Sequence, residues 1–483
     1  MKRFYFLITA LFMFSFMSAQ YTIEDVNLNG QAFKKLTGTV DVDETLDNTS
    51  LWIIADTVRV AQDAKLTITQ GTQIFAENNE TLLYVNEQGD MDWQGTSTDP
   101  VVFSSLANAP GQGAGDDTPG QWDGVRIDGD GLGTDSGIMR YVRIMYSGLG
   151  SNGLELRNVG NGTTIEYVQV YKNDGTAGIR VNTGDVNLKY IIVTNSVDRG
   201  IRFDNDGDPN DIGWSGAGQF IVVNKDIPAG NAIEARDNTT PIVSNVTITG
   251  VGFNSPGSTP DGNGFRVRDD GNLKMYNSVV TGVDRSVRTD NDTGIANGNT
   301  IFANSASFDN NLGQDMGTGF HSSADEFNPN SSSYDPSFNN TITPFTIVDS
   351  YVGTSTANST PAGALDSFFD DVNYVGAVQA GDGNDWTFGW TVTLDGTVLS
   401  VSDNELMPEI ELYPNPVQDN LNLNTNSNIS AVALYNTLGK KVYEDLAFDN
   451  NNKQIDMSQF ERGVYLLKVM SDNVPQTFKI IKK

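Results

Sequence analysis

Apolar and polar residues alternate along the middle of the chain in two short patterns, which follow one another every 22 to 32 residues. In the first pattern a small residue precedes apolar, polar and apolar positions, as in Gly178-Ile179-Arg180-Val181. In the second, an aromatic residue or an asparagine precedes a similar alternation, as in Tyr167-Val168-Gln169-Val170. Alternation with a period of two is typical of β-strands. Each repeat therefore predicts two short strands.

Two strands in each repeat, separated by corners rich in Gly, Asn and Asp, predict a parallel β-helix. One repeat cannot bury its apolar side alone, but stacked rungs close a continuous core. A β-propeller would need four strands in each repeat of ~40 residues, and the repeats here are shorter. We expect the β-helix to span residues 36–395. Its repeats are recognised by the apolar residues Leu154, Ile179, Ile201, Ile233, Phe265 and Val287.

The N-terminal segment has the features of a secretory signal peptide. Lys2 and Arg3 precede an apolar run that ends at Met17, and Ala19 offers a small residue for cleavage. We expect residues 1–19 to be removed and residues 20–35 to form a spacer before the β-helix. No later apolar stretch approaches the ~18 residues that a membrane-spanning helix needs. The sequence therefore predicts an exported protein without a transmembrane segment.

Charge and composition exclude several classes of function. The 483 residues include 61 acidic and 30 basic side chains, and a net charge of −31 does not suit a nucleic-acid-binding protein, which needs clustered cations. The absence of cysteine excludes disulfides and thiolate metal sites, and a single histidine excludes a site built from two. Residues 409–483 hold nine acidic and eight basic side chains, so almost all of the imbalance precedes them. This change predicts a linker at 396–408 and a separate C-terminal domain.

The C-terminal domain, residues 409–483, combines short alternating segments with turns, which predicts a small β-sandwich. Its motifs are Tyr413-Pro414-Asn415-Pro416, Leu438-Gly439 and Gly463-Val464-Tyr465, followed by a basic terminus. In this order they resemble the C-terminal sorting domain of the type IX secretion system of Bacteroidetes. The resemblance implies that this secretion machinery exports the protein, removes the domain, and leaves the protein released or attached to the cell surface. It assigns the sorting signal to Pro414, Asn415, Pro416, Gly439, Gly463 and Tyr465.

A second resemblance covers most of the predicted β-helix. It rests on the blocks Gly120-Gln121-Trp122-Asp123-Gly124 and Phe368-Phe369-Asp370-Asp371-Val372, with Trp386 and Trp390 after the second block. These blocks resemble secreted Bacteroidetes proteins with right-handed β-helix repeats, and the resemblance carries over no catalytic motif. It implies a right-handed helix. The complete prediction is an all-β chain, with a right-handed parallel β-helix followed by a small C-terminal β-sandwich.

The polar positions of the first pattern form predicted columns of charge. Alternate side chains of a strand point away from the packed interior, so stacked repeats align them from rung to rung. We expect a glycan or another extended ligand to bind this face, because Arg forks suit carboxylate and sulfate groups. The alternative is a solvated face on which mixed charges reduce repulsion between rungs. A shift of one residue in the register would turn the columns inward. The predicted ligand-binding residues are Arg180, Arg202, Arg236, Arg266, Arg268 and Arg288.

An acidic loop at residues 204–211 offers alternate carboxylates to a cation. Calcium binds six to eight oxygen atoms, so we predict calcium as a cofactor at this loop. The pattern of an EF-hand is not met, because Pro209 occupies the place of its glycine. The alternative is a corner rich in Asp and Asn. The predicted calcium ligands are Asp204, Asp206, Asp208 and Asp211.

These features favour a non-catalytic extracellular monomer that binds glycans or mediates adhesion, and a purely structural surface role is a third possibility. The alternative from another class is a polysaccharide lyase or glycoside hydrolase that acts on an acidic polysaccharide. A glycosidase needs two carboxylates across a groove, which Asp269-Asp270 with Asp237 or Asp290 could supply. His321 is followed by Ser322 and so lacks the His-Gly pair expected of a polygalacturonase.

Overall fold

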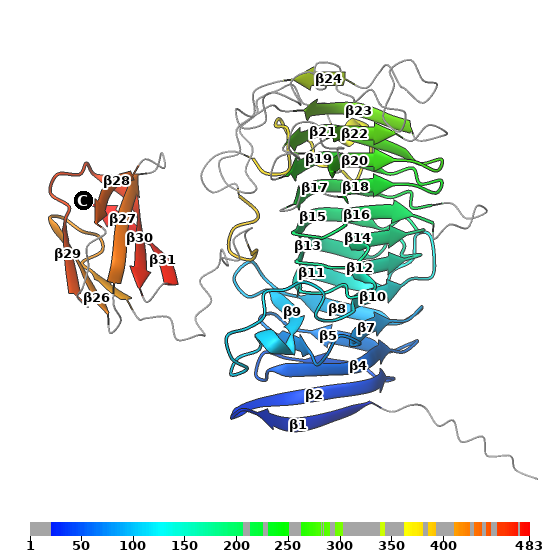
Figure 1. Ribbon diagram of the computed structural model, residues 1–483, viewed down its shortest axis with the longest axis horizontal. Helices are drawn as coiled ribbons and strands as arrows, with labels where there is room; N and C mark the ends of the chain where they lie inside the picture. The colour runs from blue at the N-terminus through cyan, green and yellow to red at the C-terminus, as the bar shows by residue number, and fades with distance from the viewer. Residues whose placement is uncertain are drawn as a thin grey trace, which may run out of the picture. The chain divides into compact units, whose positions relative to one another are not determined.

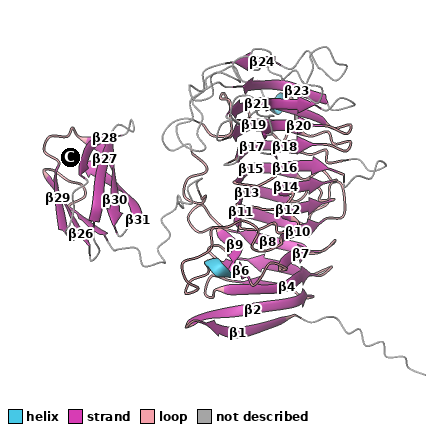
Figure 2. Ribbon diagram, in the orientation of Figure 1, coloured by secondary structure: helices cyan, strands magenta, loops and turns pink. Residues whose placement is uncertain are grey.

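A computed structural model of the protein describes residues 21–205, 213–225, 230–250, 262–281, 283, 285–289, 295–302, 339–342, 362–379, 385–392, 410–425, 429–436, 441–445, 452–471 and 474–483. The chain divides into two compact units, Met1–Ser400 and Val401–Lys483. Nearly all of their regular structure is strand, as Figure 2 shows, and this confirms the all-β prediction. Short 3₁₀ turns lie at Leu106–Asn108 (η1) and Ala362–Ala364 (η2).

The first unit contains two columns of parallel strands that alternate along the chain (Figure 1). In the regular part each strand pairs with the strands two positions before and after it, so repeats stack as the rungs of a parallel β-helix, as predicted. The first column contains β10 (Gly124–Asp128), β12 (Asn152–Arg157), β14 (Ala177–Asn182), β16 (Arg199–Asp204), β18 (Gly230–Ala235), β20 (Gly262–Val267) and β22 (Arg285–Thr289). The second contains β11 (Gly137–Met145), β13 (Thr164–Tyr171), β15 (Asn187–Thr194), β17 (Ala217–Asn224), β19 (Ile242–Thr249), β21 (Asn272–Thr281), β23 (Ile295–Phe302) and β24 (Asn339–Ile342).

Strands of the second column turn a corner at one residue with a left-handed backbone. The φ angle is +51° at Tyr141, +54° at Tyr167, +58° at Tyr190 and +56° at Phe220. Between β11 and β13 the pairing stops at Tyr141 and continues after it, so each of these strands contributes to two faces of its rung. The corner rings stack with centroids 4.2 Å apart for Tyr141 and Tyr167, 4.3 Å for Tyr167 and Tyr190, and 4.9 Å for Tyr190 and Phe220.

The N-terminal rungs begin with a hairpin. β1 (Thr22–Leu28) pairs antiparallel with β2 (Gln31–Val40), and β2 pairs parallel with β4 (Trp52–Val60). The segment 20–35 predicted as a spacer thus contains β1 and the start of β2. The other strands of these rungs are β3 (Glu44–Leu46), β5 (Lys65–Ile68), β6 (Gln73–Ala76), β7 (Leu82–Val85), β8 (Asp90–Gln94) and β9 (Val101–Ser105).

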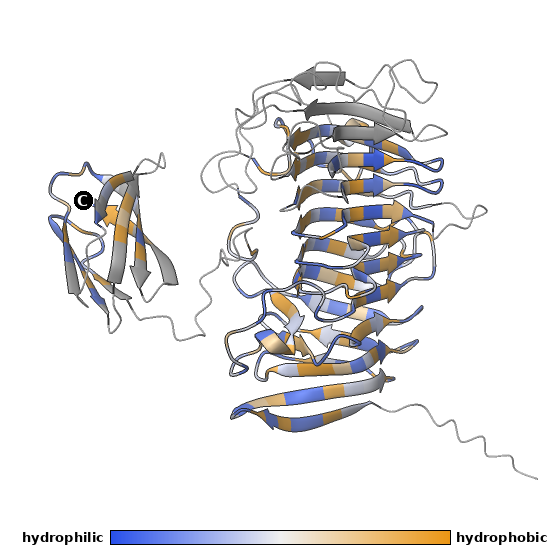
Figure 3. Cartoon of the chain, viewed as in Figure 1, coloured by the Kyte–Doolittle hydropathy of each residue, from blue (hydrophilic) through white to orange (hydrophobic). Residues whose placement is uncertain are grey.

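The core of the β-helix is built by the apolar positions of the alternation, which appear in Figure 3 as orange bands between blue ones. Ile179 and Val181 of β14 and Ile201 of β16 are fully buried. Burying each such side chain contributes about 1.5–3 kcal/mol. The small residue that opens the pattern has a packing role, because a Cβ atom on Gly178 would lie 2.5 Å from Cγ1 of Val193. Close approach of the two columns therefore requires glycine there.

The second unit contains two antiparallel sheets around one core. Leu421 from one sheet and Leu434 and Leu467 from the other are fully buried in that core, so the unit is a small β-sandwich, as predicted. One sheet has β25 (Ile410–Tyr413), β26 (Asn420–Thr425) and β29 (Asn452–Asp456). The other has β28 (Lys441–Asp445), β27 (Ile429–Asn436), β30 (Gly463–Ser471) and β31 (Val474–Lys482). Within the described ranges of both units, no helix is long and apolar enough to cross a membrane.

Candidate ligand-binding face

Polar side chains of the first column line up from rung to rung on the outside of the β-helix. Pairing between β12 and β14 places Glu155 beside Arg180, and pairing between β14 and β16 places Arg180 beside Arg202, which confirms the predicted register. For Arg288 the structure gives only its strand position. We call this column the charged ladder. It contains Arg59, Tyr84, Arg126, Glu155, Arg180, Arg202, Glu234, Arg266 and Arg288.

A neighbouring column follows the ends of the same strands. Pairing aligns Asp128, Arg157, Asn182 and Asp204 in successive rungs. Arg236 and Arg268 come directly after β18 and β20 and continue the rung-to-rung backbone pairing. The Arg236 N–H donates to the carbonyl of Phe203 at 3.0 Å, and the Arg268 N–H donates to that of Ala235 at 3.1 Å. The predicted ligand-binding arginines therefore belong to adjacent positions of one stack of strands.

Ion pairs connect the rungs of the ladder. Arg180 lies between two carboxylates, with its guanidinium nitrogens 3.1 Å from Glu155 and 3.2 Å from Asp204. Arg202 binds the same Asp204 at 2.5 Å. Burial lowers the pKa of Arg202, although the charge of Asp204 opposes this. Each carboxylate thus neutralises guanidinium groups from more than one rung.

Glu234 has the same role in the later rungs. Its carboxylate lies 3.0 Å from Arg199, 3.5 Å from Arg268 and 3.9 Å from Arg266, and it accepts a hydrogen bond of 2.7 Å from the Asn231 amide. One buried acid is therefore surrounded by three cations. Removing it would take a carboxylate from all three cations in a partly dehydrated site, although Arg199 also pairs with Asp198 and Arg268 with Asp269.

Around three of the ladder's carboxylates, the acids lie deeper than the arginines. Side chains of Asp204 and Glu234 are completely buried, whereas those of Arg202 and Arg266 keep 14 % and 20 % of their surface exposed. Arg157, beside the buried Glu155, keeps 31 %. Around Asp204, Glu234 and Glu155, a molecule that approaches therefore meets guanidinium groups before it meets carboxylates, whereas Asp269, with 39 % of its side chain exposed, lies nearer the surface than Arg268 with 18 %.

Carboxylates considered for hydrolysis are largely engaged in ion pairs. Asp237 lies 2.6 Å from Arg236, and Asp269 lies 3.2 Å from Arg236 and 2.7 Å from Arg268. Both acids therefore hold arginines of the same face. Asp290 and His321 fall outside the described residues.

Of the four predicted calcium ligands, the structure describes only Asp204, and its carboxylate is occupied by Arg180 and Arg202. Asp206, Asp208 and Asp211 lie outside the described residues. Within the described ranges, no cluster of three or more acidic or histidine side chains could hold a metal ion.

A second face of the β-helix is covered by the chain itself. We call residues 362–379 and 385–392 the strap. Gln219 exchanges hydrogen bonds of 2.8 and 2.9 Å with the backbone of Asp370, and the Asn245 amide donates to the carbonyl of Tyr374 at 3.0 Å. Trp390 is fully buried and packs edge-on against Tyr141, with ring centroids 5.7 Å apart. The strap therefore occupies the outward side chains of the second column, and the charged ladder belongs to the other one.

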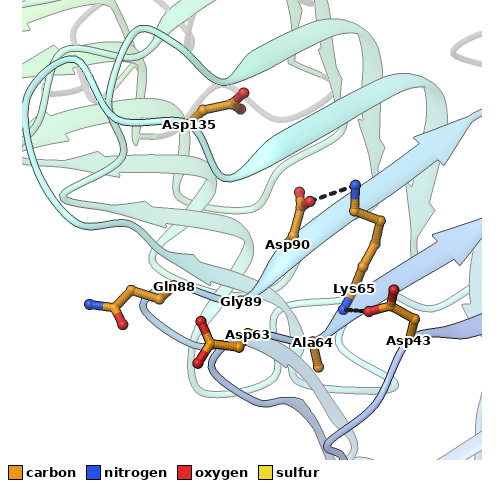
Figure 4. Close-up of a pocket in the computed structure, with 8 residues that line it drawn as sticks. All are labelled: Asp43, Asp63, Ala64, Lys65, Gln88, Gly89, Asp90 and Asp135. Atoms are coloured by element: carbon orange, nitrogen blue, oxygen red, sulfur yellow. Dashed lines mark hydrogen bonds and ion pairs between the residues drawn. The ribbon is translucent and has the colours of Figure 1, made fainter.

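An acidic pocket of about 410 Å³ lies among the N-terminal rungs (Figure 4). Lys65 Nζ lies 2.7 Å from Asp90, which raises the pKa of the lysine chiefly through their hydrogen bond, and the Lys65 N–H donates to Asp43 at 3.0 Å. Asp63 and Asp135 also line the pocket. Four carboxylates against one ammonium group do not suit an anionic ligand.

The predicted sorting residues fall into two groups. Pro414, Asn415 and Pro416 are exposed in the turn after β25, where the side-chain Oδ1 of Asn415 accepts a hydrogen bond of 2.9 Å from the Ile481 N–H. Tyr465 is buried, and its hydroxyl donates to the carbonyl of Glu461 at 2.9 Å. Gly463 is exposed at the start of β30, and Gly439 lies outside the described residues.

Comparison with known proteins gives one similarity for each unit and one for a shorter stretch. Residues 411–483 match the family model of a secretion system C-terminal sorting domain, so the protein is exported to the cell surface or the extracellular space by the type IX secretion machinery. Over 156 residues the chain is 28 % identical to an ulvan lyase of Nonlabens ulvanivorans, an alignment that covers 31 % of this chain and only 27 % of that enzyme. Residues 38–135 and 129–391 match the model of a pectate-lyase-like β-helix domain. The chain therefore belongs to the pectate-lyase-like β-helix family and carries a C-terminal sorting domain.

Proposed function

We propose that the protein is a non-catalytic extracellular binding protein whose charged ladder holds an acidic polysaccharide. The difference in depth between the carboxylates of Asp204 and Glu234 and the arginines around them is the observation that carries this proposal. Asp204 and Glu234 are buried, and the partly exposed Arg202 and Arg266 lie where a ligand would touch the face. Guanidinium groups bind carboxylate and sulfate through paired, charge-assisted hydrogen bonds.

The arrangement of the ladder favours a linear ligand. Its residues follow one another across parallel strands, which lie ~4.8 Å apart in a sheet. From Arg126 through Arg180 to Arg266, cations recur along one line on the outside of the β-helix. A polymer with repeated anionic groups can contact several of these rungs at once. Such contacts add affinity because later ones form within the same complex.

A direct binding measurement tests the proposal. Calorimetric titration of the exported protein with polygalacturonate, dextran sulfate and neutral dextran should give binding to the anionic polymers alone. Arg202→Gln should weaken that binding by roughly tenfold or more, the equivalent of ~1.4 kcal/mol. Arg140→Gln is the matched control, because Arg140 is also paired with a carboxylate, Glu166 at 2.9 Å, but lies in β11 outside the ladder. Equal binding of neutral dextran, or no binding of either polyanion, would overturn the proposal.

A polysaccharide lyase is the second candidate, and the alignment with the ulvan lyase favours it. A lyase needs a base near cations that neutralise a carboxylate. In the ladder, Tyr84 lies among cations, but burial raises the pKa of its hydroxyl. That shift does not suit a base at neutral pH. Release of ultraviolet-absorbing unsaturated sugars from an acidic polysaccharide would replace the binding proposal with this one.

Calcium binding at residues 204–211 is a separate proposal. Because Asp204 is held by two arginines, we assign the ligands mainly to Asp206, Asp208 and Asp211. Calcium should then raise the melting temperature above that measured in chelator, since a ligand that binds only the folded state stabilises it. Asp208→Asn should remove most of the difference. Identical melting temperatures with calcium and with chelator would count against the site.

A further inference from the structure

We propose that Arg59, in the early rung formed by β4, is the anchoring anion site of the charged ladder and grips a carboxylate or sulfate group of the bound polymer. The inference rests on the proposed function and adds to it a residue that sets where the polymer is held. Three observations support it: the position of Arg59, the platform on which it lies, and the absence of a carboxylate beside it.

The position of Arg59 follows from the register in which its strand pairs with its neighbours. β4 pairs with β7 so that Arg59 lies beside Tyr84, and β7 pairs with β10 so that Tyr84 lies beside Arg126. The neighbours of Arg59 in its own strand, Val58 and Val60, are fully buried. Arg59 therefore points outward, in the same column as the arginines of the later rungs.

The platform is the ring of Tyr84, which lies between Arg59 and Arg126 in the strand register. The Cζ atom of Arg59 lies 4.6 Å from the centroid of Tyr84, and that of Arg126 lies 4.8 Å from it. The Tyr84 hydroxyl donates to Asp128 at 2.6 Å, and Asp128 also accepts two hydrogen bonds from Arg126, at 2.7 and 2.6 Å. These contacts fix the ring, so the guanidinium of Arg59 rests on a support that cannot easily rotate.

Charge distinguishes Arg59 from the other arginines of this face. Arg126 is paired with Asp128, Arg180 with Glu155 and Arg202 with Asp204. In the part of the chain that the structure describes, no carboxylate lies within ion-pair distance of Arg59. The side chain is partly exposed. It therefore presents positive charge that no carboxylate among the described residues neutralises.

The chemistry of this arrangement suits a forked anion. A guanidinium held over a ring by cation–π attraction can keep the N–H groups along its edge available to donate to a ligand. Two parallel hydrogen bonds to one carboxylate or sulfate group then form at little entropic cost, because the guanidinium is already oriented. Paired arginines further along, such as Arg202, offer a ligand only the N–H donors that their carboxylates leave available.

The test uses the exported protein, titrated with polygalacturonate as a carboxylate polymer and with dextran sulfate as a sulfate polymer. Arg59→Gln should weaken binding of at least one polymer by roughly tenfold or more. Arg59→Lys should lose nearly as much affinity, because an ammonium group keeps the positive charge but not the forked pair of donors. The control Arg140→Gln removes an arginine of β11 that is paired with Glu166 at 2.9 Å and lies outside the ladder, and it should change the affinity by less than ~threefold.

Outcomes of this test separate the two proposals. If the wild-type protein binds a polyanion and Arg59→Gln binds equally well, the anchoring assignment is wrong and the proposed function stands. If Arg59→Lys keeps the full wild-type affinity, forked recognition is wrong. If the wild-type protein binds neither polymer, both proposals fail. Should Arg59→Gln not fold, as judged by its melting temperature, Arg59→Lys decides the assignment.

Discussion

The side-chain amide of Gln169 is hydrogen-bonded to both backbone groups of Val392, donating to the carbonyl at 2.7 Å and accepting from the N–H at 2.8 Å, although 223 residues separate them. The outward side chain of Gln169 thus makes the pair of hydrogen bonds with the end of the strap that a neighbouring strand would otherwise make. Both residues are buried. Similar bonds between Gln219 and Asp370 repeat the arrangement four strands later in the chain.

This contact predicts that Gln169→Leu loosens the strap. The leucine has a similar volume but removes both hydrogen bonds that Gln169 makes with the backbone of Val392, at a cost of about 1–3 kcal/mol for each. We expect a lower free energy of unfolding in urea and faster proteolysis near Val392. Gln94→Leu is the control, because the side chain of Gln94 is exposed and, among the described residues, its amide donates only to Asp92. Equal losses in the two variants would show that the amide does not hold the strap.

Asp204→Asn is predicted to destabilise the β-helix strongly. Asp204 is fully buried and binds Arg180 and Arg202, so its neutralisation removes the carboxylate that pairs with Arg202 and leaves Arg180 to depend on Glu155. Removing one partner of a buried ion pair typically costs about 3–5 kcal/mol. Asp269→Asn, at a side chain that keeps 39 % exposure, should cost below ~1 kcal/mol. Chemical denaturation of both variants measures the difference, and a small loss in Asp204→Asn would contradict the structural role.

The sequence predicted the ladder well because one local rule determines it. A small residue followed by alternating apolar and polar positions identifies both the strand and its outward side, as for Arg180 between Ile179 and Val181. Arg59 and Tyr84 obey the same alternation, but their strands lack the small opening residue of the first pattern, so neither was among the predicted ligand-binding residues. The signal that could have found them is the pair of flanking valines or leucines.

Burial depth and the strap could not be predicted in this way. Whether Glu234 is exposed depends on arginines in neighbouring rungs, and no spacing within one strand records that depth. The strap has no alternation, and its contacts join residues more than a hundred positions apart, as between Asn245 and Tyr374. For the same reason the sequence could not indicate which face remains available to a ligand.

Ionisation of the Tyr146 hydroxyl should lower the free energy of unfolding at alkaline pH. Burial, together with the nearby Asp117, whose carboxylate accepts a hydrogen bond of 3.3 Å from it, raises its pKa to about 12 from a usual value of 10. Because the folded state holds this proton more tightly, its contribution is complete below about pH 10 and is lost as the pH rises to about 12. Tyr146→Phe should therefore lose less stability across that range than the wild type. Urea unfolding at several pH values measures both slopes, and equal slopes would refute the assignment.

Deletion of residues 409–483 is expected to stop export after the first membrane has been crossed. The deleted part is a folded unit with its own core of Leu421, Leu434 and Leu467, so its loss should leave the β-helix intact. The truncated protein should accumulate in the periplasm, folded and with an unchanged melting temperature, because the signal for the outer membrane is missing. Fractionation of cells and protease accessibility of the β-helix measure its location. A substitution that unfolds the unit from inside, Leu434→Asp, should have the same effect, since it buries a charge without a partner. Surface display of either variant at the wild-type level would show that export does not depend on the folded sorting domain.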